Sequence, residues 1–98
     1  MEPAATAGRA HWYVGPFYRM LMDTFPLYRT GRDLLDVRRL ADELGRSNEV
    51  VYRWLREGQI SNTVARRLVK LASAPENQQA IVAAGGTPPE LRDFLPFM

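Results

Sequence analysis

The chain has 98 residues, of which 46% are hydrophobic and 24% are charged, with a net charge of +2. A chain of this length buries roughly two-thirds of its unfolded surface, enough for one hydrophobic core. It has no cysteine, which excludes disulfides, thiolate metal sites and a cysteine nucleophile. No apolar run is long enough to cross a membrane, and residues 1–10 lack the apolar stretch of a secretory signal. We therefore expect a soluble cytoplasmic protein with a flexible leader at 1–10 and a single helical domain at 11–98.

The basic residues are concentrated in the middle of the chain. Residues 29–70 carry ten basic and six acidic side chains, a net charge of +4. Residues 1–28 are neutral overall, and residues 71–98 have a net charge of −2. This polarity is typical of a surface that faces phosphate groups, and a solvated surface explains it as well.

The aromatic-rich segment that follows residue 10 contains the first predicted helix. Gly15 followed by Pro16 is a favourable helix start, and the next proline ends the helix at about residue 24 or 25. Apolar side chains fall on two faces of this helix, with Phe17 on one and Tyr18 and Met22 on the other. A second chain or the C-terminal tail is therefore expected to cover the second face.

Further helices are predicted by residues that favour helix starts, because their side chains accept hydrogen bonds from free backbone N–H groups. The starts and helices are Asp36 for 37–44, Ser47 or Asn48 for 48–57, Ser61 for 62–73, Ser73 with Glu76 for 77–84, and Thr87 with Glu90 for a C-terminal helix. No stretch shows the alternation of apolar and polar residues that predicts a strand. The expected fold class is all-α, with five to six short helices.

Residues 36–57 have the pattern of a helix, a glycine turn and a second helix. Two helices that cross through a short turn need a small residue where they touch, here Ala41, and a residue that tolerates positive φ, here Gly45. The apolar residues that complete the predicted core of this motif are Leu40, Leu44, Val51 and Trp54. The spacing resembles the helix-turn-helix of the lambda-repressor/Cro-like family of phage and bacterial regulators. The resemblance covers residues 36–73, because the segment 60–72 is similar to the family's next helix.

The resemblance implies a sequence-specific transcription regulator that places its second motif helix in the major groove of double-stranded DNA. Such regulators act as homodimers on half-sites about one helical turn apart. The residues then expected to contact bases are Ser47, Asn48, Glu49, Tyr52 and Arg53. Those expected to contact phosphates are Arg38, Arg46, Arg56, Asn62, Thr63 and Arg66. An alternative for Arg53 is an ion pair with Glu49 or Glu57 on its own helix.

The C-terminal segment 87–98 is rich in apolar residues. Candidate contacts to a second copy, to RNA polymerase or to another protein are Phe17, Tyr18, Met22, Phe94 and Phe97. The alternative is that the tail folds back over the first helix of the same chain.

No constellation of residues indicates an enzyme. The three serines all fall at predicted helix starts, no nucleophile is paired with a base, and the carboxylates are scattered. We expect no catalytic residue, no cofactor, no metal and no membrane partner. Two alternatives to a regulator stay open. One is a DNA-recognition adaptor of the phage-packaging or antitoxin-like kind, and the other is a protein-interaction module that uses the same helices without DNA.

Overall fold

The computed structural model describes residues 15–98, and this part of the chain is helical, which confirms the predicted all-α class. Its elements are α2 (Pro16–Thr24), α3 (Val37–Leu44), α4 (Asn48–Glu57), α5 (Asn62–Ala72), α6 (Pro75–Ala83) and the 3₁₀ helix η2 (Leu91–Phe97). The predicted leader and the first four residues of the predicted domain lie outside the described residues. No helix in the described range is long and apolar enough to cross a membrane.

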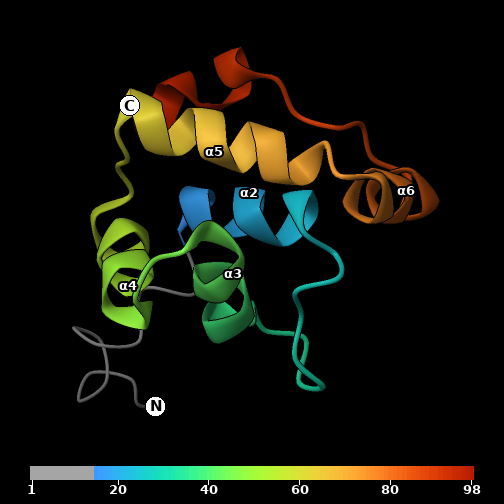
Figure 1. The fold of residues 1–98 in the computed structure, drawn as a ribbon, viewed down its shortest axis with the longest axis horizontal. Coiled ribbons are helices and arrows are strands. Elements are labelled where there is room, and N and C mark those ends of the chain that lie inside the picture. Colours follow the sequence, from blue (N-terminus) through green and yellow to red (C-terminus); the bar gives the residue numbers. More distant parts are fainter. Residues whose placement is uncertain (1–14) are drawn as a thin grey trace.

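Helix α2 occupies the middle of the molecule. Figure 1 shows α3 and α4 on one side of it, and α5 crossing it on the other side with η2 beyond. Both apolar faces of α2 are covered within the chain, since Phe17 is 1% exposed and Tyr18 is 6% exposed. The Tyr18 hydroxyl accepts a hydrogen bond of 3.0 Å from the backbone N–H of Leu35. The second face of this helix therefore needs no second chain.

The connection between α2 and α3 is an ordered turn built on aromatic packing. The rings of Phe25 and Tyr28 stack with centroids 5.3 Å apart, and the guanidinium of Arg39 lies 4.8 Å from the Tyr28 ring centroid. An isolated β-bridge pairs Arg29 with Leu35. Residues 15–98 contain no strand pairing that is longer than this bridge. The turn thus ends directly at the start of α3.

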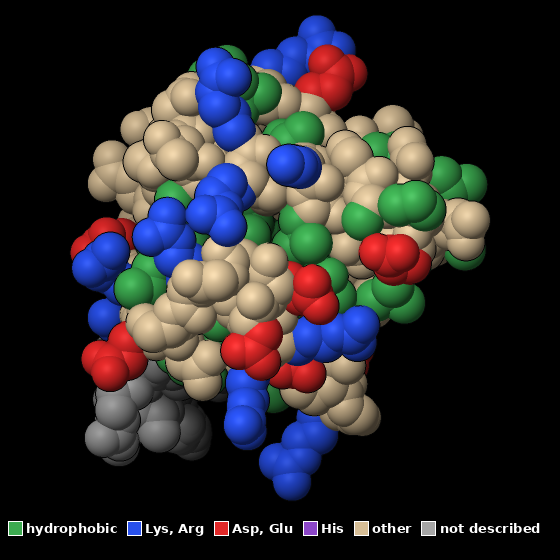
Figure 2. Space-filling view, in the orientation of Figure 1, with side chains coloured by type: hydrophobic (Ala, Val, Ile, Leu, Met, Phe, Trp, Pro, Cys, Tyr) green, Lys and Arg blue, Asp and Glu red, His purple; other side chains and the backbone are tan. Residues whose placement is uncertain are grey.

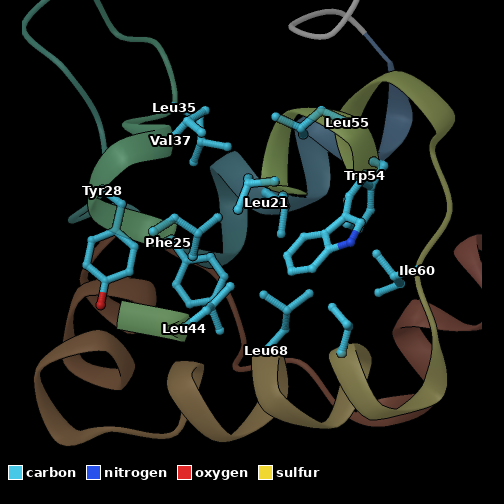
Figure 3. Packing of buried hydrophobic residues seen from close by; sticks show 14 of the residues in the cluster. Leu21, Phe25, Tyr28, Leu35, Val37, Leu44, Trp54, Leu55, Ile60 and Leu68 are labelled. Carbon is cyan, nitrogen blue, oxygen red and sulfur yellow. The ribbon is translucent and has the colours of Figure 1, made fainter. Parts of the chain in front are cut away.

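The hydrophobic core lies between α2, α3, α4 and α5. Figure 3 shows the indole of Trp54 directed into this core, on the side of Leu68 and Ile60. Leu21 and Leu68 are fully buried, and Trp54 is 6% exposed. Burial of such side chains contributes roughly 1.5–3 kcal/mol each, so this cluster fixes how α4 sits on the rest of the molecule.

The two capping boxes predicted for the C-terminal third are wrong in position. Ser73 ends α5, where its hydroxyl donates to the carbonyl of Val69 at 2.9 Å, and α6 begins at Pro75 without a side-chain cap. Thr87 does not cap a helix. The last helix begins at Leu91, where the N–H of Glu90 donates to Asp93 Oδ2 at 2.8 Å. Helix α6 instead begins with a proline, Pro75, in its first turn. Helix η2 begins where the carboxylate of Asp93 accepts the N–H of Glu90.

The C-terminal tail folds back onto its own chain. Phe94 is fully buried, the rings of Phe97 and Phe17 lie 5.1 Å apart, and the N–H of Ile60 donates to the Phe97 carbonyl at 2.8 Å. Three of the five residues predicted to contact a second chain are therefore core residues of this chain, and the prediction is corrected for them. They are Phe17, Tyr18 and Phe94. Met22 and Phe97 are only half-buried and pack against the same core.

Candidate nucleic-acid interface

The turn between α3 and α4 sets the direction in which α4 leaves the body. Gly45 adopts the left-handed conformation with φ of 69°, a region that costs other residues about 1–2 kcal/mol. Its N–H and that of Arg46 return to the last turn of α3, Arg46 donating to the Ala41 carbonyl at 2.9 Å. The hydroxyl of Ser47 then accepts from the N–H of Val50 at 3.3 Å and starts α4.

The apolar side chains of the motif meet in its interior. Leu40, Ala41 and Val51 are fully buried, and Leu44 is 2% exposed. Because Ala41 has no side chain beyond Cβ, α3 and α4 approach each other closely at this position. These contacts leave one side of α4 directed away from the protein.

Among the residues predicted to contact bases, four are exposed and one is not. Asn48, Glu49 and Arg53 are exposed on α4, and Ser47 is exposed at its cap. Tyr52 is half-buried and packs against the core, so its ring forms part of the support of the helix. The outward side of α4 therefore presents an amide, a carboxylate and a guanidinium.

Arg53 is the most informative side chain on this surface. Glu49 precedes it by four residues and Glu57 follows it by four, a spacing that allows an ion pair on either side. Arg53 forms no hydrogen bond or ion pair with any of residues 15–98. Glu49 and Arg56 lie in the first and last turns of α4, where the helix dipole favours them. Arg53 sits in the middle of the helix and has no such structural role.

The residues predicted to contact phosphates fall into two groups. Arg38, Arg46 and Arg56 are exposed and unpaired within the described part of the chain. Asn62 and Arg66 are exposed but bonded to each other, since Arg66 Nε donates to Asn62 Oδ1 at 2.6 Å. Thr63 is exposed in the first turn of α5. In this turn the N–H of Val64 already donates to the Ser61 hydroxyl at 3.2 Å.

A groove runs along the edge of α4 that faces α5. It encloses about 500 Å³, and its charged lining includes Arg46, Arg53 and Glu57. Trp54 and Val64 contribute apolar surface to it. The sequence does not reveal this groove, because it forms only where the turn before α4 meets the start of α5.

Arg67 has a structural role that sequence reasoning missed. Its Nη2 donates to the carbonyl of Leu44 at 2.7 Å and so satisfies a free carbonyl at the end of α3. No local pattern reveals this bond, because Arg67 lies on α5, 23 positions from Leu44. Two basic side chains of α5, Arg66 and Arg67, thus have hydrogen-bond partners within the chain.

Charge is unevenly spread over the molecule. Figure 2 shows Lys and Arg side chains near the junction of α4 and α5, and a mixture of Asp, Glu, Lys and Arg side chains below, near α3. Across residues 15–98, no group of three His, Cys, Asp or Glu side chains has the arrangement of a metal site. Comparison with protein-family models, curated proteins and solved structures finds no match to the chain.

Proposed function

We propose that the chain is a sequence-specific double-stranded DNA-binding regulator of transcription, of the phage repressor/Cro type. Helix α4 enters the major groove in this proposal, with Asn48, Glu49 and Arg53 at base edges. Arg38 and Arg46 contact the phosphate backbone and fix the register of the helix on the duplex.

The observation that carries the proposal is the free guanidinium of Arg53. The Arg53 side chain projects from the middle of α4, and Trp54 fixes another side of this helix in the core. Arg53 pairs with neither Glu49 nor Glu57, which lie four residues before and after it on the helix. A guanidinium without an internal partner offers two parallel donors, which match the O6 and N7 acceptors of guanine. The neighbouring Glu49 repels phosphates, so the surface favours base selection over indiscriminate binding.

Recruitment of RNA polymerase or another partner through the C-terminal tail is not part of the proposal. Phe94 is buried, and the Phe97 carbonyl already accepts the N–H of Ile60. A tail that acts as a hook would have to leave these contacts first.

The test begins with selection of bound duplexes from a random pool at two salt concentrations. Arg53→Ala is expected to cost about 1–3 kcal/mol on the selected site and to relax preference at one base pair. Arg46→Ala is expected to weaken all duplexes alike and to lower the slope of log K against log salt by about 0.9. Arg92→Ala, which removes an exposed arginine from η2, is the matched control and is expected to change neither quantity.

Two results would contradict the proposal. One is the absence of any enriched sequence together with binding that disappears at moderate salt. The other is an identical loss for Arg53→Ala and Arg92→Ala, because α4 would then have no special part in binding.

A further inference from the structure

The N-terminal end of α4 has little attachment to the core of its own. Leu44 at the end of α3 and Val51 in α4 are buried, but no residue from 45 to 50 is buried. This stretch holds the turn, the Ser47 cap and two side chains that the proposed function places at base edges, Asn48 and Glu49. Their position therefore depends on what holds the turn.

A side chain from α5 reaches this turn. Arg67 Nη2 donates to the Leu44 carbonyl at 2.7 Å, and it lies 3.9 Å from the place that a Cβ on Gly45 would occupy. Hydrogen bonds from a charged donor are roughly twice as strong as those between neutral groups. Leu68, which follows Arg67, is fully buried, so the donor comes from a part of α5 that the core fixes.

Arg67 bonds to a backbone carbonyl although a carboxylate lies in the same groove. This groove encloses about 510 Å³ between the ends of α3 and α5, and Glu43, Arg67 and Lys70 form its charged lining. Within residues 15–98, Arg67 forms no ion pair with Glu43. The guanidinium is thus directed to the end of α3 and not to the acidic side chain beside it.

We propose that Arg67 is a positioning residue for the outward side of α4. Its bond to the Leu44 carbonyl holds the α3–α4 turn against α5 and so fixes the direction of the first turn of α4. The effect on the turn follows from this geometry, and the effect on DNA rests on the proposed function. Side chains that read base edges must be held to within about 0.5 Å, whereas attraction to phosphates is independent of sequence. Loss of Arg67 therefore lowers discrimination between sequences more than it lowers binding to DNA in general.

The first test follows the turn without DNA. Arg67→Met removes the donor and keeps an unbranched side chain, and NMR measures hydrogen exchange of the Arg46 N–H, which donates to the Ala41 carbonyl at 2.9 Å. Opening of the turn is expected to make this exchange about tenfold faster. The Ala65 N–H, which donates to the Ser61 carbonyl at 2.9 Å at the start of α5, is the internal reference and is expected to keep its rate.

The second test compares the Kd for the selected duplex with the Kd for a duplex of scrambled sequence. Arg67→Met is expected to lower the ratio of the two affinities about tenfold, which is the discrimination that one bidentate base contact supplies. The slope of log K against log salt is expected to stay unchanged, because no phosphate contact is lost. Lys70→Met is the matched control, since it removes an unpaired charge from the same helix and groove. It is expected to change neither quantity.

Two results without DNA overturn the proposal. One is an unchanged exchange rate at Arg46, because the turn would then not depend on Arg67. The other is an equal acceleration at Ala65, which would show a general loss of stability and no specific hold on the turn. Circular dichroism establishes that each variant remains helical, and Arg67→Gln, which is uncharged and two atoms shorter, replaces Arg67→Met if that variant does not fold.

The results with DNA separate this proposal from the proposed function. An equal loss on both duplexes with a lower salt slope overturns the positioning role, since Arg67 would then be a phosphate contact. An equal fall of the ratio in Lys70→Met overturns it too, because charge alone would explain the loss. A wild-type chain that prefers no sequence contradicts the proposed function and the effect of Arg67 on DNA, while the exchange of the Arg46 N–H still decides whether Arg67 holds the turn.

Discussion

Helices α4 and α6 are both short, and each has one buried side, but their exposed sides differ in chemistry. The outward side of α4 carries Glu49, Arg53 and Arg56, whereas that of α6 carries Gln78 and Val82, and its one charged side chain, Glu76, lies in the first turn. Charged donors and acceptors suit the base edges and phosphates of DNA, and a helix face with few charges is less suited to them. The two helices thus expose faces of different charge within one small domain.

The two helices also differ in how firmly they are held. Helix α4 has the cap of Ser47 at its start, the left-handed Gly58 at its end and Trp54 in the core. Helix α6 has no side-chain cap, and Asn77, which attaches it, is left with a buried Oδ1 that has no hydrogen-bond partner. A surface that reads base edges needs an accurate position, and the caps and core contacts of α4 supply one.

The largest expected effect tests the support of α4. Trp54→Ala should lower the free energy of unfolding by about 3–5 kcal/mol, because it removes a core indole and leaves a cavity. Denaturation with urea measures this loss. Val82→Ala on α6 is the contrasting variant, and a change within about 0.5 kcal/mol is expected for this exposed position. Equal stability of Trp54→Ala and the wild type would mean that α4 presents a different side to the core.

An intermediate effect separates the turns beside the two surfaces. Gly45 and Gly85 have φ of 69° and 86°; a Cβ at Gly85 would meet nothing within 4 Å, and one at Gly45 would make only an ordinary contact of 3.9 Å with Arg67 Nη2. Alanine should therefore cost about 1–2 kcal/mol at each site through backbone strain alone. Only Gly45→Ala should also weaken DNA binding, because it alters the turn that directs α4. Gly31→Ala, in open surroundings and without positive φ, should leave the melting temperature nearly unchanged. Loss of DNA binding in Gly85→Ala would contradict this division.

The smallest expected effect compares two serines near helix starts. Ser47→Ala should cost about 1 kcal/mol, because the hydroxyl accepts the N–H of Val50 at the start of α4. Ser73→Ala should change stability by no more than about 0.5 kcal/mol, since Ser73 follows α5 and does not cap α6. Thermal unfolding of both variants measures the difference. A larger loss for Ser73→Ala would show that its bond to the Val69 carbonyl matters more than the cap.

The sequence predicted the central helices closely because their signals are local. Asp36, Ser47 and Ser61 each accept a backbone N–H three residues later, and Gly45 ends α3 through its own conformation. The C-terminal third was predicted poorly because several start signals compete there. Helix α6 begins at Pro75, two residues after Ser73, and η2 begins at Leu91 and not at Pro88.

For the candidate interface, the sequence identified the exposed positions of α4 but not their bonding. Helical periodicity distinguishes Arg53 from Trp54, since consecutive residues point about 100° apart around the helix, and Arg53 is exposed whereas Trp54 is buried. It does not tell whether a guanidinium is paired. Asn62 and Arg66 bond to each other at the i, i+4 spacing of α5, and Arg67 reaches the Leu44 carbonyl across 23 positions of the chain. The second bond depends on how α3 and α5 pack.

The sequence by itself determined the all-α class, the four central helices and the side of α4 that faces outward, because caps, glycine turns and apolar periodicity act over a few residues. Only the tertiary structure decided what covers α2. Burial of Phe17 depends on Phe97, which lies eighty positions further along the chain and meets it at 5.1 Å. Pairings over such separations follow from the fit of whole helices, which no local pattern of residues encodes.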